Sequence, residues 1–338
     1  MPAYAIGVDL GGTNLRIAAV NAAGNLLQKI TTGAQVAKGR DFVVAEMTDA
    51  IRQLSAKFAS LGELTGIGIG VPGILDMETG VVRKSPNLPD WIDYPVREEI
   101  ERRLKTQVVL ENDANVATLG EKWLGAGREV DSLCMITLGT GVGGGLILNE
   151  RIWRGMSGMA SELGHINVER EGPPCGCGSR GCLEQFASAT AIKRMAIEAI
   201  AKGEAPELAR AMKEEPEFSS RIVYQMAVQG DGVAQQIFHV VGSALGITIG
   251  GLVNTFNLPM YVIGGGVASA WDAFAPAMME EVRKRSFVYT ATEPNPNLPN
   301  KKKTIITRAL LGSDAGLYGA ARLPLLEVRK TETIELRA

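Results

Sequence analysis

Three cysteines and a histidine lie near the middle of the chain with a spacing that suits a metal ion. One glycine separates Cys175 from Cys177, four residues separate Cys177 from Cys182, and His165 lies upstream of all three. Three thiolates and one imidazole form a tetrahedral ligand set that zinc prefers. Because four protein ligands leave no open coordination position, we predict a structural zinc ion rather than a catalytic one.

The remaining cysteine and histidine stand apart from this cluster. Cys134 lies in an apolar strand and is expected to be a core thiol, whereas His239 lies in an apolar helical run and is expected to be a packed or surface residue. The N-terminal residues lack the basic and apolar regions of an export signal, so we expect a cytoplasmic, reducing setting. In that setting clustered cysteines bind metal more often than they form disulfides.

Two glycine-rich turns have the composition of phosphate-binding loops. The segments 5–27 and 133–152 each contain an apolar strand, a Gly/Thr turn and a second apolar strand. We predict two β-hairpins whose backbone N–H groups could cradle an anion. Asp9, at the bend of the first hairpin, could hold Mg²⁺ directly or through water. The alternative is that Asp9 only satisfies the amides of its own turn.

Two GxGxxG patterns, at 68–73 and 139–144, resemble a dinucleotide fingerprint only superficially. That fingerprint follows a strand and opens a helix. Here Gly73 leads into the sequence ILDMETGVV and Gly144 leads into the apolar strand GLILN, so neither context fits. The chain also contains no GxxxxGK[ST], which excludes a P-loop.

Strands and helices alternate around both hairpins. Apolar residues at helical spacing predict helices over 42–61, 96–104, 114–124 and 273–285 and a mostly helical stretch over 189–258. Short apolar runs predict strands over 64–71, 108–110, 261–263 and 304–307. Asn112 or Asp113 could cap the helix that begins at 114. This alternation predicts an α/β fold with two related domains flanking a cleft.

The expected domain boundary lies near Asp113. The small α/β domain would contain residues 1–113 and about 313–326, because we expect the C-terminal helix to return to it. The large domain, 114–312, would carry the zinc site. A chain of 338 residues is long enough for two such domains with well-buried cores.

Charge and hydropathy exclude several classes of partner. The net charge of −2 does not indicate a nucleic-acid binder, and the run of three lysines at 301–303 is short enough to be a solvated loop. The most apolar segment, 240–258, is interrupted by Asn254 and several glycines, so we expect no membrane span.

Six motifs together resemble the ROK family (repressors, open reading frames, kinases) and, within it, the bacterial glucokinases. In chain order they are DLGGTNLR, ENDAN, LGTGVGGG, ELGHI, CGCGSRGCLE and IGGGV, spread over most of the chain. The resemblance implies an actin-like ATPase (ribonuclease H-like) fold and ATP-dependent phosphorylation of glucose to glucose 6-phosphate. It also implies Mg²⁺ with the ATP, structural Zn²⁺ and a homodimer.

The resemblance assigns roles to individual residues. Asp113 would be the general base that takes the proton from the sugar 6-hydroxyl, although on its own it could equally be a helix cap. His165 would bind zinc through one ring nitrogen and a sugar hydroxyl through the other. The expected sugar contacts are Asn87, Asn112, Asp113, Glu162, His165 and Glu184. The expected nucleotide contacts are Asp9, Gly11, Gly12, Thr13, Thr137, Gly139, Thr140 and Gly141, with Gly264, Gly265 and Gly266 on the adenosine side.

Two alternatives remain open. The acceptor could be N-acetylmannosamine, N-acetylglucosamine or fructose, because the same side chains recognise hydroxyls common to these sugars. The chain could also be a non-catalytic sugar sensor, although Asp113 and both phosphate turns favour a kinase. The family's repressors carry an N-terminal helix-turn-helix, whereas this sequence begins at the first hairpin strand, so we do not expect DNA binding. Asn14 occupies a position where many relatives carry lysine, and we assign it no role.

Overall fold

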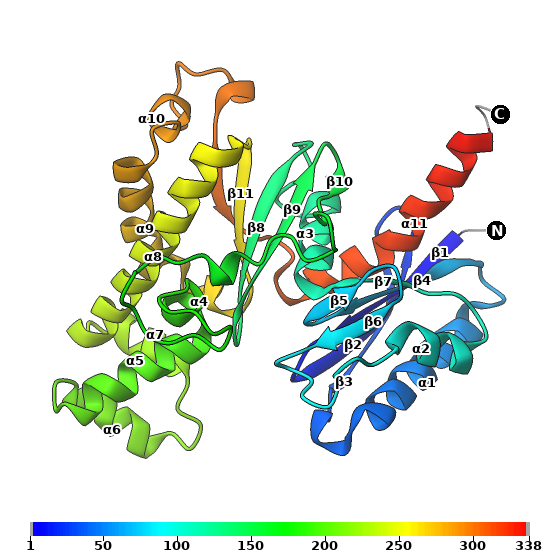
Figure 1. Ribbon diagram of the computed structural model, residues 1–338, viewed down its shortest axis with the longest axis horizontal. Helices are drawn as coiled ribbons and strands as arrows, with labels where there is room; N and C mark the ends of the chain where they lie inside the picture. The colour runs from blue at the N-terminus through cyan, green and yellow to red at the C-terminus, as the bar shows by residue number, and fades with distance from the viewer. Residues whose placement is uncertain (1–2, 336–338) are drawn as a thin grey trace. The chain divides into compact units, whose positions relative to one another are not determined.

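The computed structural model describes residues 3–335, with side chains described for 3–326 (Figure 1). The chain forms two compact units. The first extends to Asp131 and includes Gly145–Ser161 and the chain from Ser313 onward. The second consists of Ser132–Gly144 and Glu162–Gly312.

The first unit is built on a five-stranded sheet with the order β3-β2-β1-β4-β7. The strands β1 (Ala3–Leu10), β2 (Asn14–Asn21) and β3 (Leu26–Gly33) are antiparallel neighbours, which confirms the first predicted hairpin. The strands β4 (Glu63–Val71) and β7 (Val109–Asn112) run parallel to β1. The sequence did not predict β3, because this edge strand is largely exposed and carries a weak apolar signal.

Side chains of β1 alternate between the two faces of this sheet. Its large apolar residues pack in one core with α1 (Arg40–Phe58) and α2 (Val96–Leu104). Its small residues face α11 (Ala315–Glu335), and a Cβ on Gly7 would lie 2.4 Å from the Leu317 carbonyl oxygen. Asp9 shares the face of Ala5 and Gly7, so the strand presents its carboxylate to the start of α11.

Helix α3 (Asp113–Trp123) packs against α11 through two glycines. A Cβ on Gly120 would lie 2.0 Å from the Ala315 carbonyl oxygen, and one on Gly319 would lie 1.6 Å from the Val116 carbonyl oxygen. This close approach ties α3 to the first unit, which therefore continues to Asp131. The division thus falls one helix later than the boundary that we expected near Asp113.

A second five-stranded sheet has the order β10-β9-β8-β11-β12. Its strands β8 (Leu133–Leu138), β11 (Met260–Gly264) and β12 (Ile305–Arg308) are parallel. The strand β9 (Val142–Leu148) follows the second glycine turn and pairs with the short β10 (Arg151–Ile152). Since β8 and β9 are neighbours in the sheet, the second predicted hairpin is also confirmed.

Both GxGxxG patterns lead into strands rather than helices. Gly73 is followed by β5 (Ile74–Asp76), which pairs with β6 (Val81–Lys84), and Gly144 lies within β9. The prediction that neither pattern is a dinucleotide fingerprint is therefore confirmed at the level of local structure.

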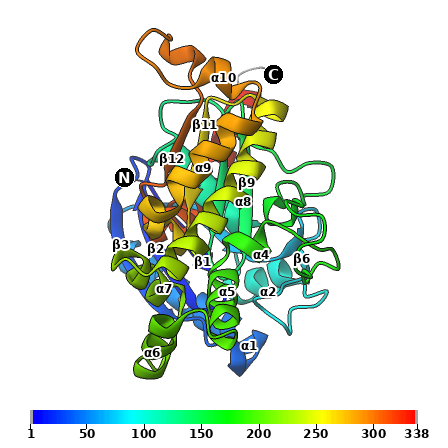
Figure 2. The ribbon, with the colours of Figure 1, turned by 90° about the vertical axis from the view of Figure 1, so that its left-hand side faces the viewer.

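The second unit is rich in helices, as expected for residues 189–258. In Figure 2, α8 and α9 run side by side. Glycine permits their contact, because a Cβ on Gly242 would lie 2.2 Å from the Phe274 carbonyl oxygen. By length and composition α8 could span a membrane, but 67% of its most apolar window is buried within the protein, as in a core helix. The helices are α4 (Glu184–Ala187), α5 (Ala189–Ala201), α6 (Pro206–Glu214), α7 (Ser220–Val228), α8 (Gly232–Phe256), α9 (Trp271–Arg285) and α10 (Tyr289–Thr292).

Candidate active site and metal centre

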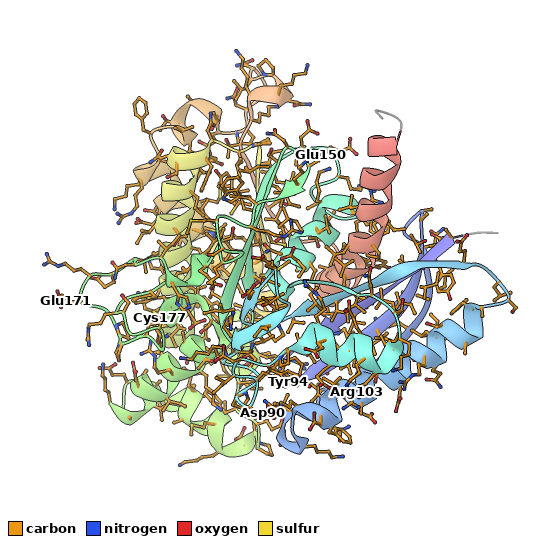
Figure 3. The ribbon with its side chains drawn as sticks, turned by 45° about the vertical axis from the view of Figure 1, so that its right-hand side comes forward. Asp90, Tyr94, Arg103, Glu150, Glu171 and Cys177 are labelled. Carbon is orange, nitrogen blue, oxygen red and sulfur yellow. The ribbon has the colours of Figure 1, made fainter. Side chains whose placement is uncertain are left out.

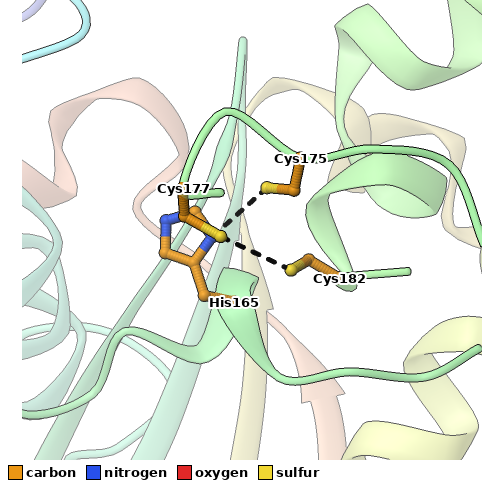
Figure 4. Close-up of side chains that lie close together, drawn as sticks. All are labelled: His165, Cys175, Cys177 and Cys182. Carbon is orange, nitrogen blue, oxygen red and sulfur yellow. Dashed lines mark hydrogen bonds between the residues drawn. The ribbon is translucent and has the colours of Figure 1, made fainter. Parts of the chain in front are cut away.

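The four predicted metal ligands lie together in the second unit (Figure 4). Cys175 Sγ is 3.6 Å from His165 Nδ1, Cys177 Sγ is 3.8 Å from Cys182 Sγ, and all four ligand atoms lie within 4.8 Å of one another. Zn–S bonds of about 2.3 Å and a Zn–N bond of about 2.05 Å at tetrahedral angles separate two sulfurs by about 3.8 Å and sulfur from nitrogen by about 3.6 Å. The cluster therefore has the donor types that zinc prefers, and two of its ligand–ligand distances match those of a tetrahedral zinc site.

Backbone hydrogen bonds and glycines shape the loops that carry these ligands. The Leu183 N–H donates to the Ile166 carbonyl at 2.9 Å, which joins the segments that hold His165 and Cys182. Gly181 has a φ of 64°, and a Cβ there would lie 1.6 Å from the Glu169 carbonyl oxygen. The glycines of CGCGSRGCLE thus allow the tight folding that the sequence indicated.

The cysteines of the cluster are free thiols with unlike environments. Burial raises the pKa of Cys182 to about 12, whereas a backbone hydrogen bond at Ser179 lowers the pKa of Cys177. A bound metal ion favours the thiolate form of all its cysteine ligands. Cys134 is a buried core thiol whose pKa burial raises to about 12, and His239 is exposed, which agrees with both expectations.

Two carboxylates lie beside the cluster of candidate metal ligands. Glu162 precedes the 3-10 turn η2 (Leu163–His165), and Glu184 begins α4. Desolvation raises the pKa of Glu162; the nearby His165 opposes this shift and the Glu184 charge adds to it. The structure therefore brings together the three expected sugar contacts of the second unit.

The second glycine turn and the late glycine triplet lie at the same edge of the second sheet. Thr137 pairs with Gly264 across the parallel strands β8 and β11. Gly265 has a φ of 83°, and a Cβ there would lie 2.4 Å from the Leu138 carbonyl oxygen. Ligands of parallel α/β sheets bind at such carboxyl ends of strands, and this edge carries the expected nucleotide contacts of the second unit.

Asp9 occupies a partly buried, acidic position at the first glycine turn. Arg16 Nη1 donates to its Oδ2 at 3.1 Å, and a Cβ on Gly316 would lie 2.8 Å from its Cγ. Burial raises the pKa of Asp9, Arg16 lowers it, and Asp314 raises it further. Two neighbouring carboxylates, Asp9 and Asp314, provide oxygen ligands suited to Mg²⁺.

The sequence did not identify Asp314 or Gly316 as parts of this site. They lie in the Gly-Ser-Asp-Ala-Gly segment that precedes and opens α11, about 300 residues from Asp9. The available signal was a helix start with glycine, serine and aspartate directly after the last strand. Such a sequence predicts the start of a helix, but it does not predict which strand that helix end contacts.

Asn112 is the N-cap of α3, which leaves Asp113 as the first residue of the helix. Asn112 Oδ1 accepts from the Ala114 and Asn115 N–H groups at 2.9 and 3.3 Å, and its Nδ2 donates to the Gly73 carbonyl at 3.2 Å. Asp113 Oδ1 also accepts from the Ala114 N–H at 2.9 Å. Asn112 is therefore the main cap of α3. One of the two protons on its Nδ2 is used in the hydrogen bond to the Gly73 carbonyl.

A buried carboxylate supports this turn. Glu111 is fully buried; its Oε1 accepts from the Asn112 N–H and from Asn115 Nδ2, both at 3.0 Å. Its Oε2 accepts from Arg154 Nε at 2.6 Å. The sequence showed Glu111 at the end of a buried strand, but it contained no signal for Arg154 as its partner.

The loop that carries Asn87 belongs to the first unit and is held in place by contacts with Arg40. Figure 3 labels two residues of this loop, Asp90 and Tyr94. The Arg40 N–H donates to Asp90 at 2.7 Å, and the Arg40 guanidinium lies 4.6 Å from the centroid of the Tyr94 ring. A Cβ on Gly12 would lie 3.1 Å from Asn87 Cβ, so this loop reaches the first glycine turn. Asn87, Asn112 and Asp113 thus belong to the first unit, whereas Glu162, His165 and Glu184 belong to the second.

The fold is that of the actin-like ATPases: two α/β units, each with a glycine hairpin whose strands join a sheet that also contains parallel strands. The chain belongs to the ROK family, whose model matches residues 5–326. Both the fold and the family that the motifs indicated are therefore confirmed.

Three known proteins illustrate the relationship. A glucokinase of Thermotoga maritima is 37% identical over 94% of this chain and 96% of its own length. The crystal structure of a ROK family glucokinase from Streptomyces griseus in complex with glucose and AMPPNP aligns with a TM-score of 0.76, at 33% identity over 95% of this chain and 98% of its own. A putative xylose repressor of a Caldicellulosiruptor species is 31% identical over 84% of this chain and 71% of its own length.

Proposed function

We propose that this chain transfers the γ-phosphate of ATP to the 6-hydroxyl of glucose. The chain is an ATP-dependent hexose kinase of the ROK family. The observation that carries the choice of glucose is the 37% identity to a glucokinase over 94% of the chain. The related structure with glucose and AMPPNP supports the same pair of substrates.

Asp113 is the general base of this proposal. Its carboxylate lies directly after the buried strand β7, in the first turn of α3, where the Asn112 cap and Glu111 hold the backbone. It takes the proton from the sugar 6-hydroxyl as that oxygen attacks the γ-phosphate in line. Asn87, Asn112, Glu162, His165 and Glu184 orient the sugar through its other hydroxyls.

The glycine turns bind the phosphates. The backbone N–H groups of Gly11–Thr13 and Gly139–Gly141 stabilise the charge on the transferred group, and Gly264–Gly266 lie on the adenosine side. Asp9 would hold Mg²⁺ directly or through water, and that ion supplies further neutralisation of phosphate charge.

The metal cluster orients the sugar-binding residues. His165 faces Cys175 with Nδ1, which leaves Nε2 for a sugar hydroxyl. His165, Cys175, Cys177 and Cys182 would hold Zn²⁺, which supplies structural rigidity and no step of the reaction. The family also leads us to expect a cytoplasmic homodimer.

A coupled assay of ADP release over a panel of hexoses and N-acetylhexosamines tests the substrate. We expect the highest kcat/KM with glucose. A higher value with N-acetylmannosamine, N-acetylglucosamine or fructose would transfer the proposal to that sugar.

Replacement of Asp113 by Asn tests the base. We expect kcat to fall by about 10²–10⁴-fold, the usual contribution of general-base catalysis, while glucose still binds. Isothermal titration with glucose provides the binding control. Activity close to that of the wild type would rule out Asp113 as the base.

A sugar sensor without catalysis is the second candidate, and the similarity to the putative xylose repressor favours it. The same panel separates the two functions. Sugar binding without ADP release for any sugar would favour the sensor.

A further inference from the structure

The backbone of Val142 is held on both sides by the loops that carry the candidate metal ligands. Glu184 Oε2 accepts from the Val142 N–H at 3.0 Å. On the other side, a Cβ on Gly164 would lie 2.1 Å from the Val142 carbonyl oxygen, so only glycine allows this backbone approach. Gly164 precedes the candidate ligand His165, and Glu184 follows the candidate ligand Cys182 by two residues. Both segments that carry candidate ligands therefore contact the backbone of the same residue, one at its N–H and the other at its carbonyl.

The same chain segment also supports the glycine turn before Val142. The Ala189 N–H donates to the Gly139 carbonyl at 2.8 Å, and Thr190 Oγ1 donates to the Thr140 carbonyl at 2.7 Å. A Cβ on Gly141 would lie 2.4 Å from Glu184 Oε2, so this glycine makes room for the carboxylate. Residues 184–190 therefore contact the turn at each of its residues from 139 to 142.

We propose that Glu184 is a positioning residue for the nucleotide: it holds the 139–141 turn in the conformation that receives the phosphates. Its Oε2 is directed to the turn, which leaves Oε1 for the sugar. The metal cluster then braces the nucleotide side of the site as well as the sugar side. This inference rests on the proposed function, in which the 139–141 turn binds ATP phosphates.

The effect of Glu184 on the turn depends on the strength of its hydrogen bond with the Val142 N–H. A carboxylate that accepts from a backbone N–H forms a charge-assisted bond, which is stronger than a bond between neutral groups. Val142 is buried, so loss of this acceptor leaves its N–H without a partner and releases the turn. A glycine-rich turn without that restraint has to be ordered by the nucleotide itself, which lowers the affinity.

Isothermal titration with Mg²⁺–AMPPNP, without sugar, measures this effect on the metal-loaded protein. We expect Glu184→Ala to weaken AMPPNP binding by about 10-fold, as for loss of one charge-assisted hydrogen bond. Glu184→Gln keeps an oxygen that can accept from Val142, so we expect a change below about threefold. Glu171→Ala is the matched control: it removes an exposed carboxylate from the same 162–184 region, one that pairs with Arg170, so AMPPNP affinity should stay within about twofold.

Hydrogen exchange of the Val142 amide is a second readout that does not depend on activity. We expect faster exchange in Glu184→Ala and after removal of the metal by chelation, and wild-type exchange in Glu171→Ala. If Glu184→Ala does not fold, chelation of the wild type followed by AMPPNP titration takes its place.

Three outcomes are decisive. Weaker AMPPNP binding together with faster Val142 exchange supports the inference. Wild-type AMPPNP affinity in Glu184→Ala, in a preparation whose parent protein turns over sugar, overturns the inference but leaves the proposed kinase intact. Failure of the wild type to bind AMPPNP overturns both.

Discussion

The Glu111–Arg154 ion pair supports the residue that we propose as the base. Glu111 is fully buried and accepts three hydrogen bonds, two of which hold Asn112 and Asn115 around Asp113. Arg154, whose side chain is 38% exposed, is the charged partner of this carboxylate. Removal of one partner of such a pair leaves a buried charge without compensation, which is far more costly than loss of a surface pair.

We therefore expect Arg154→Ala to lower the free energy of unfolding by about 3 kcal/mol and kcat by about 10-fold or more, with a smaller effect on KM for ATP. Urea unfolding and steady-state kinetics measure both. Arg102→Ala removes an exposed i,i+3 partner of Glu99 and should change stability by less than about 0.5 kcal/mol.

The double variant Arg154→Ala/Glu111→Gln tests whether the uncompensated charge of Glu111 causes the loss of stability. Because the neutral amide removes the uncompensated charge, most of the stability should return, whereas kcat should remain low. Equal stability of the single and double variants would contradict the role assigned to the buried charge.

At the scale of elements, glycines decide which helix covers which surface. Small residues on one face of β1 admit α11, and two glycines bring α3 and α11 into backbone contact. This packing places Gly316 and Asp314 beside Asp9 and keeps α3, with Asp113, on the first unit. The geometry of the candidate site therefore depends on residues that do no chemistry.

Gly120→Ala tests this packing. A Cβ there would lie 2.0 Å from the Ala315 carbonyl oxygen, and such overpacking should cost about 1–3 kcal/mol of stability. Gly251→Ala is the matched control on α8: it is an exposed helical glycine with no atom within 4 Å of the added Cβ, so it should stabilise by about 0.5–1 kcal/mol. Urea unfolding measures both; destabilisation of equal size in the two variants would contradict the packing argument.

At the scale of the whole molecule, the 162–184 region of the second unit differs from the first unit in what stabilises it. The first unit has cores on both faces of its sheet, whereas the 162–184 region of the second unit is mostly loop and turn and carries the metal ligands. A structural metal ion contributes directly to the stability of such a region.

Cys177→Ala should therefore lose zinc, as measured by elemental analysis, and increase hydrogen exchange in residues 162–184. Exchange in β1 and α1 of the first unit should not change. Sugar affinity should fall because His165 and Glu184 lose their support, and if Glu184 positions the 139–141 turn, ATP affinity should fall as well. Full zinc content in Cys177→Ala would contradict the Cys₃His assignment.

Sequence alone determined the features that depend on local spacing. The cluster of candidate metal ligands, both glycine hairpins and the helix of 96–104 follow from residue types a few positions apart, because local hydrogen bonding and side-chain periodicity are encoded over such distances. The motifs of the glycine turns and the cysteine loop were also sufficient to indicate the ROK family.

Only the tertiary structure decided which distant segments meet. Asp9 with Asp314, Glu111 with Arg154, and Glu184 with the Val142 peptide are separated by about 300, 43 and 42 residues. No local pattern specifies such pairs, because they follow from the faces on which helices and loops pack. Those faces are set by where small residues allow two backbones to approach, and this steric condition becomes visible only when both segments are in place.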